Sequence, residues 1–221
     1  MATWIAHLRI AENILNEIKE IERIPFVAGN IAPDSGVPNE DWSSFEPPYN
    51  ITHWLNVEDR LVNSDAFYNK YLKDKKNKND KELCSFLLGY YTHLLTDIEW
   101  TKLFNLKMQE QIYKDNLEKD PKFIWEIKKD WYGQDFEYLK ENKDSLFYSC
   151  FQHIGEVKDY LDYFPKGAFT NRFTYIREFY QKGYDKKEEF VYFSKKEMDD
   201  FVDNASFNIK KVLKLRLVEV L

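Results

Sequence analysis

The sequence predicts an all-α protein of a single domain, and three observations support this class. Apolar residues recur at helical spacing through most of the chain, whereas strand-like alternation is confined to short pieces near residues 190–193. Proline and glycine, seven of each in 221 residues, are few and cluster between residues 25 and 50. No internal repeat or low-complexity tract marks a domain boundary, so residues 1–221 are expected to form one multi-helix bundle.

The first helix is predicted from an apolar stripe that runs from Trp4 to Ile18, with His7 on the neighbouring inward stripe. Residues 25–50 are predicted to form one long loop, and structureless loops beyond about 12–15 residues are often functional. Further helices are predicted at 58–73, 80–106, 121–130, 144–163, 168–182 and 195–218. The last begins at a capping box made by Ser194 and Glu197.

Composition excludes several classes of protein. The net charge is −6 and the basic residues are scattered, so no surface for duplex nucleic acid is expected, although a nucleotide or single-stranded substrate stays compatible. The first residues lack the apolar region of a secretory signal and no run approaches the roughly 20 apolar residues of a membrane span, which favours a cytoplasmic location. Cys84 and Cys150 lie in apolar segments and are predicted to be core residues without a disulfide. Whether the C-terminal KKVLKLRLVEVL packs internally or on another chain is open, and with it the oligomeric state.

The stretch LLGYYTHLLTDIEW, residues 87–100, places two polar side chains in a helix that is apolar on nearly every side. Such a helix is normally buried, and burying an imidazole and a carboxylate without partners costs several kcal/mol. His93 and Asp97 are one turn apart on the same face, so both could bind one cation. The alternative is a buried, hydrogen-bonded pair or ion pair without metal.

The chain has four histidines, and each lies among apolar or aromatic residues, as buried metal ligands often do. His53 precedes Trp54, and Asp34 follows Pro33 in the predicted loop. Both residue types bind zinc. An ordinary turn at PDSG and a helix-capping role for His53 are the alternatives.

The motifs TWxxHLRIAE, GNIAPDSG, THW and LGYYTHLLTDxxW, in this order over about the first 100 residues, resemble the zinc-dependent phospholipase C-like proteins of the zinc phospholipase C and single-strand nuclease superfamily. The resemblance implies an all-helical fold with a metal cleft. It also implies hydrolysis of phosphate esters by a metal-activated water.

The resemblance implies metal ligands at His7, Asp34, His53, His93 and Asp97. Asp34, His53, His93 and Asp97 would hold a central zinc ion, and Asp97 and His7 would hold a second one. The ions are one or two in number, and another divalent metal would suit the same residues. Asp34 is also the candidate catalytic residue, which would orient or deprotonate the attacking water.

The chain departs from the family pattern at three places. Trp4 follows three residues, so it presents no free amine unless the chain is processed, and Leu103 stands where members have a further histidine. One of the usual three metal sites is therefore expected to be missing. His153 is a possible later ligand or pocket residue. Members of the family have Glu or Asp four residues after their later histidine, but here that position is Val157.

These observations predict a metal-dependent hydrolase of small phosphate esters. The alternative is a catalytically inactive, metal-stabilised binding module of the same fold. A metal-dependent phosphohydrolase of the HD type needs adjacent His and Asp, and the sequence contains no such pair. Arg9 and Arg60 are candidates for phosphate contact. Tryptophans that could line a substrate groove are Trp4, Trp42, Trp54 and Trp100.

Overall fold

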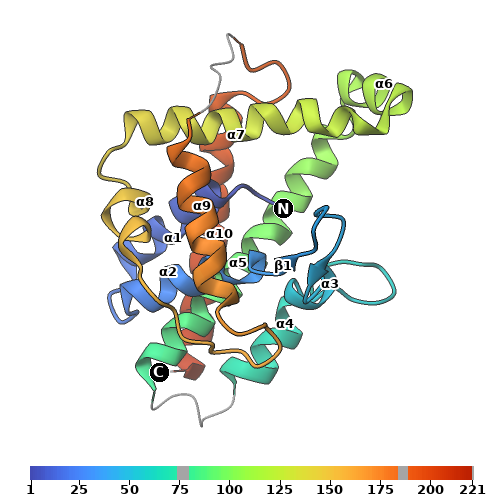
Figure 1. Cartoon of the computed structure of the whole chain (residues 1–221). Coiled ribbons are helices and arrows are strands. Elements are labelled where there is room, and N and C mark those ends of the chain that lie inside the picture. The colour runs from blue at the N-terminus through green and yellow to red at the C-terminus, as the bar shows by residue number, and fades with distance from the viewer. Residues whose placement is uncertain (74–79, 184–188, 221) are drawn as a thin grey trace.

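A computed structural model describes residues 1–73, 80–183 and 189–220, and it confirms the predicted all-α class (Figure 1). Among these residues no helix combines the length and the apolar character needed to cross a bilayer. The long helices are α1 (Trp4–Glu17), α2 (Arg23–Ile31), α5 (Lys81–Lys107), α6 (Gln111–Lys119), α7 (Ile124–Glu141), α9 (Ala168–Gln181) and α10 (Lys195–Val220). The short helical elements are η1 (Ala32–Asp34), α3 (Tyr49–Thr52), α4 (Ser64–Phe67), the π-helical turn η2 (Tyr68–Leu72), η4 (Pro121–Phe123), α8 (Leu146–Ser149) and η5 (Phe151–His153).

The helix α5 runs through the bundle, and α1, α2, α4 and α10 all contact it. In Figure 1, α7 crosses one end of the bundle and α9 runs in front of α10. Within the described residues, the one sheet is a small antiparallel hairpin of β1 (Val37–Pro38) and β2 (Phe45–Glu46), in which Val37 pairs with Glu46. The hairpin follows η1 directly, so it lies beside the segment that ends at Asp34.

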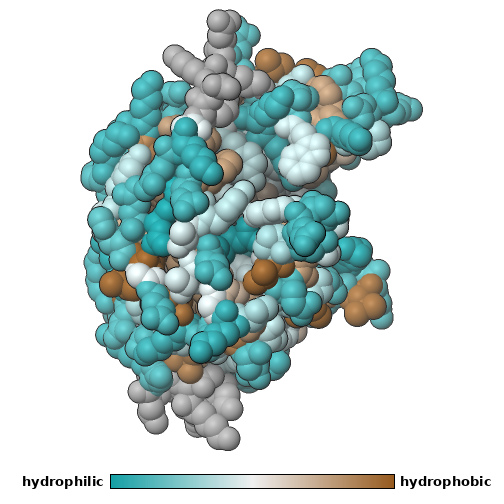
Figure 2. All heavy atoms as spheres, viewed as in Figure 1, coloured by the Kyte–Doolittle hydropathy of each residue, from teal (hydrophilic) through white to brown (hydrophobic). Residues whose placement is uncertain are grey.

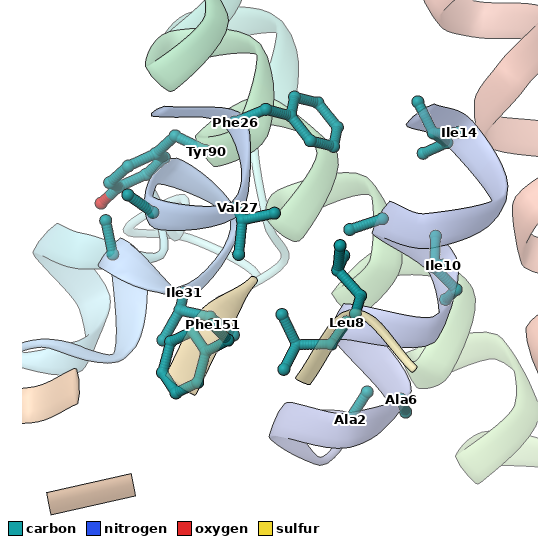
Figure 3. Close-up of a cluster of buried hydrophobic side chains, with 14 of the residues drawn as sticks. Ala2, Ala6, Leu8, Ile10, Ile14, Phe26, Val27, Ile31, Tyr90 and Phe151 are labelled. Atoms are coloured by element: carbon teal, nitrogen blue, oxygen red, sulfur yellow. The ribbon is translucent and has the colours of Figure 1, made fainter. Parts of the chain in front are cut away.

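Helices α1 and α2 bury their apolar faces in one core. Figure 3 draws Leu8 and Ile14 of α1 in the same cluster as Phe26 and Val27 of α2, and all four side chains are at most 1% exposed. Full burial of such a side chain contributes about 1.5–3 kcal/mol each. This core holds α1 and α2 in place beside α5, and both carry groups that reach the candidate site.

The prediction of one long loop over 25–50 is wrong in its first part, because α2 extends to Ile31 and continues into η1. Pro25 lies in the first turn of α2, where a missing N–H breaks no helical hydrogen bond. Gly29 packs against the backbone of α5, since a Cβ added there would lie 1.9 Å from the carbonyl oxygen of Phe86. Gly89 of α5 packs against α2 in the same way, since a Cβ added at Gly89 would lie 2.0 Å from the carbonyl oxygen of Phe26. The glycine that suggested a loop instead permits close packing of two helices.

Other predicted boundaries also change. The predicted helix over 144–163 is wrong beyond α8 and η5, since the chain leaves helical geometry at Ile154 (ψ 118°). Only the second half of 58–73 is helical, because the preceding residues form a bridge between Leu55 and Val62. The helix α6 was not predicted, and α7 extends well past residue 130.

The helices predicted at 80–106, 168–182 and 195–218 are confirmed as α5, α9 and α10. The capping box of α10 is present: the Ser194 N–H donates to Glu197 Oε2 at 2.8 Å, and the Glu197 N–H donates to Ser194 Oγ at 3.3 Å. Cys84 and Cys150 are both buried, as predicted for core residues.

Candidate metal centre and pocket

Five residues singled out in the sequence come together in the interior of the helical bundle. His7 lies on α1, Asp34 ends η1, His53 follows α3, and His93 and Asp97 lie on α5. Two groups have candidate ligand atoms within 4.8 Å of one another: His7 with His93 and Asp97, and Asp34 with His53 and His93. The structure therefore brings together all five residues from four separate parts of the chain.

The orientation of His93 follows from the close packing of α2 on α5. Its Nδ1 lies 2.7 Å from the carbonyl oxygen of Asn30 on α2. A carbonyl oxygen only accepts hydrogen bonds, so Nδ1 carries a proton and donates. Nε2 then faces the interior of the cluster, 3.5 Å from Asp97 Oδ2. A backbone carbonyl on the distal nitrogen is a usual support for a metal-bound imidazole.

His53 presents its Nε2 to the same point. Its Nδ1 lies 2.9 Å from Thr52 Oγ1, and its ring stacks on Tyr49 with centroids 3.9 Å apart. Nε2 lies 3.2 Å from His93 Nε2 and 3.3 Å from Asp34 Oδ1. These contacts orient the ring through both of its nitrogens and through one ring face.

The donor set fits a tetrahedral zinc ion. Nitrogen and oxygen ligands at about 2.0–2.1 Å from zinc lie about 3.3 Å from each other. His53 Nε2 is 3.2 Å from His93 Nε2, 3.3 Å from Asp34 Oδ1 and 3.6 Å from Asp97 Oδ2. Asp97 Oδ2 is buried and accepts no hydrogen bond from any described residue. A cation bound among these four atoms would compensate that oxygen.

The cluster carries negative charge that needs an internal positive partner. Burial opposes ionisation of Asp34 and Asp97, but neighbouring imidazoles, and the chain's α-amino group for Asp97, outweigh it and hold the pKa of Asp34 at about 2 and that of Asp97 well below its usual range. Burial alone would lower the pKa of His93, but the adjacent Asp97 carboxylate and the charge of Asp34 outweigh burial and raise it. Burial lowers the pKa of His53, and that of His7 to about 4. Without metal, a proton on His93 is the available counter-charge, and a divalent cation would replace it.

His7 occupies the far side of the cluster. Its ring stacks on His93 with centroids 3.8 Å apart and an interplanar angle of 2°. Its Nε2 lies 3.5 Å from Asp97 Oδ1, which accepts the N–H of Ala2 at 3.1 Å. The ring is fully buried, and neither nitrogen has a hydrogen-bond partner among the described residues. The position suits a second ligand set shared with Asp97, and a role for His7 in metal binding stays a prediction.

A cavity of about 720 Å³ opens beside the cluster, and Asp34 and His53 form part of its wall. Figure 2 shows the surface hollowed on the side between α6 and the segment around α3. Asp34 Oδ2 accepts the indole N–H of Trp4 at 2.9 Å, which fixes the carboxylate at the wall. The aromatic residues that line the cavity are Trp4, Trp42, Phe45, Tyr49, Trp100, Phe104, Trp125, Trp131, Tyr132 and Tyr175.

His153 does not join the cluster. It is exposed at the end of η5 and belongs to neither ligand group. The predicted helix over 144–163 does not continue beyond His153, and the His153 side chain lies at the surface. The suggestion that His153 binds metal or lines the pocket is therefore corrected.

The predicted phosphate contacts are also corrected. Arg9 forms an ion pair with Asp199 at 2.6 Å, and Arg60 is exposed at a turn with φ of 57°. Neither lines the cavity. Of the four tryptophans, Trp54 packs instead against Phe67 and Tyr71, and the other three line the cavity.

Sequence reasoning missed the part of the cavity wall that comes from α7 and α9. Lys128 and Arg172 supply its two cationic side chains, and Tyr132 and Tyr175 lie in the same wall. The available signal was the aromatic density of these helices, which an ordinary helical core explains equally well.

Comparison with known proteins is consistent with the geometry. Residues 6–100 match the family model described as zinc dependent phospholipase C, and this confirms the resemblance predicted from the motifs. The matched segment contains all five residues of the cluster. No curated protein and no solved structure matches the chain.

Proposed function

We propose that this chain, which is related over residues 6–100 to the zinc-dependent phospholipase C family, is a metal-dependent phosphoesterase. One observation carries the proposal: ligand atoms of Asp34, His53 and His93 lie within 4.8 Å of one another at the wall of a large cavity, and Asp97 Oδ2 lies 3.5–3.6 Å from both imidazoles. A buried structural site would be closed on all sides. Here two of the ligands also line a space that a substrate can enter.

In the proposed mechanism, His53, His93 and Asp97 would hold the ion, and Asp34, which lines the cavity, would face both the ion and a water molecule beside it. Zinc held there would lower the pKa of a water molecule toward about 7 and polarise a phosphoryl oxygen. The carbonyl of Asn30 and the hydroxyl of Thr52 keep both imidazoles in the ligand orientation.

Asp34 is the proposed catalytic residue. Its pKa of about 2 keeps it ionised at neutral pH, and Trp4 holds Oδ2 while Oδ1 faces the cluster. It would orient the attacking water and accept its proton. The resulting hydroxide would add to phosphorus, the P–O bond to the alcohol would break, and the alcohol would leave with the proton that Asp34 had accepted.

The proposal is tested with full-length protein purified without a histidine tag. We expect one or two zinc ions per chain by elemental analysis, and hydrolysis of bis-p-nitrophenyl phosphate that stops after prolonged chelation and returns with zinc. His93→Ala should lose metal and activity. His153→Ala is the matched control, because it removes an exposed imidazole outside the cluster and should keep both.

Two outcomes would contradict the proposal in different ways. Hydrolysis that survives chelation and is equal in His93→Ala would exclude the metal mechanism. Bound zinc without hydrolysis of any phosphate ester would instead favour a metal-stabilised binding module of the same fold.

A further inference from the structure

The charges that line the cavity are unequal. Among the described residues, Asp34 is its single carboxylate, and the proposed ion would take that charge. Lys128 of α7 and Arg172 of α9 also line it. The space left for substrate is therefore bordered by aromatic rings and by positive charge.

Arg172 is already engaged in holding the wall together. Its Nη2 donates to the carbonyl oxygen of Gly36 at 2.6 Å, and its guanidinium lies 5.5–5.8 Å from the ring centroids of Trp42, Phe45 and Tyr175. The side chain joins α9 to the hairpin that follows Asp34. Its main role is thus structural.

Lys128 is different, because no described residue gives it an acidic or hydrogen-bonding partner. Its Nζ lies over the ring of Trp125 at 4.5 Å from the centroid, and burial lowers its pKa. The next residue, Lys129, forms an ion pair with Glu126 at 2.7 Å. A partly desolvated ammonium that faces a cavity without a counter-ion is a binding position for an anion.

We propose that Lys128 binds an anionic group of the substrate and makes this cavity select negatively charged aromatic or apolar phosphate esters over zwitterionic ones. The inference rests on the proposed function. Aromatic side chains such as Trp125 and Tyr132 would contact the apolar part of the ester, and Lys128 would pair with its negative charge. A substrate whose alcohol carries a quaternary ammonium would bring a second cation into the space that Lys128 lines, where no second carboxylate among the described residues would pair with it.

The test compares two esters that share a leaving group, with zinc-loaded full-length protein. Bis-p-nitrophenyl phosphate is an anion, and p-nitrophenyl phosphorylcholine is a zwitterion. We expect wild type to prefer the anion. Lys128→Gln should raise KM for the anion roughly tenfold, the size of one hydrogen bond to a charged group, with kcat little changed. Lys128→Glu should shift the preference toward the phosphorylcholine ester, and Lys129→Gln, the matched control, should leave it unchanged.

A second measurement separates this inference from the proposed function. Binding of phenylphosphonate, followed by tryptophan fluorescence, should weaken by a similar factor in Lys128→Gln and not in Lys129→Gln. Lys128-dependent binding without hydrolysis of either ester would refute the phosphoesterase and keep the anion site. Hydrolysis by wild type with unchanged selectivity and binding in Lys128→Gln would overturn the inference alone. A uniform loss of kcat on both esters would point to a structural role and overturn it as well.

Discussion

Asp97 on α5 and Asp135 on α7 are both buried carboxylates, at 1% and 2% exposure, yet their surroundings favour opposite charge states. Asp97 lies among His7, His53 and His93, and its pKa falls well below the usual range despite burial. Burial raises the pKa of Asp135 to about 7, although its two hydrogen bonds lower it.

The difference comes from the partners of each carboxylate. Asp135 accepts hydrogen bonds from the hydroxyls of Thr3 at 2.6 Å and Tyr180 at 2.5 Å, so both of its oxygens are satisfied. Asp97 Oδ2 accepts none among the described residues. Burial disfavours the charged form of both carboxylates. Hydroxyl groups can hydrogen-bond a neutral carboxylic acid, whereas the imidazoles and the second carboxylate around Asp97 favour a bound cation. Asp135 therefore joins α7 to Thr3 and to α9, whereas Asp97 Oδ2 is available to bind a cation.

The largest difference between the two sites is expected when each carboxylate is neutralised without a change of shape. Asp97→Asn removes a proposed ligand and should lower kcat/KM for bis-p-nitrophenyl phosphate by at least about a hundredfold, with loss of bound zinc. Asp135→Asn should keep the zinc content and most of the activity, because an amide can bond both hydroxyls. Steady-state kinetics and elemental analysis on both proteins measure this. Equal effects of the two substitutions would show that the two sites do not differ as described.

Zinc should stabilise the folded protein through the site that contains Asp97, and this stabilisation should not depend on Asp135. An ion that binds only the folded chain adds about 2.7 kcal/mol of unfolding free energy at one hundred times its Kd. For a chain of this size that raises Tm by roughly 5–10 °C. Thermal unfolding with zinc and with EDTA checks the shift. Asp135→Asn should keep it and Asp97→Asn should lose it; a shift that persists in Asp97→Asn would place the ion elsewhere.

The smallest expected effect concerns pH. The pKa of Asp135 is raised from 3.8 in the unfolded chain to about 7 in the folded one. Between these values the folded state binds more protons, so the contribution of Asp135 to stability is complete below pH 4 and is lost as the pH rises toward 7. The slope is at most about 1.4 kcal/mol per pH unit for one proton.

Urea unfolding of wild type and Asp135→Asn in EDTA from pH 4 to 8 measures this slope. Asp135→Asn cannot ionise, so its unfolding free energy relative to wild type should rise across pH 4–7 and level off above. Parallel curves for the two proteins would mean that Asp135 keeps its ordinary pKa and that the contrast with Asp97 is wrong.

Two residues of the candidate site were predictable because they break a local pattern, whereas Asp34, His53 and His7 were expected from the family resemblance. His93 and Asp97 stand out inside an apolar helix, and their spacing alone places them on one face. The segment around Gly29 was misjudged, because a glycine that permits close helix packing has the same local signature as one in a turn. His153 was misplaced for a similar reason, since the end of the predicted helix depends on packing outside its own segment.

Hydrophobic period and residue type are local properties, so the amino-acid sequence was enough to predict the all-α class, the buried α5 and the position of His93 and Asp97 on one face of it. The folded structure was needed to show that Asp34 and His53 reach His93, and that Lys128 faces the same cavity with no acidic or hydrogen-bonding partner among the described residues. Those relations join residues far apart in the chain, and they depend on how closely α2 packs on α5 and on where α7 crosses the bundle.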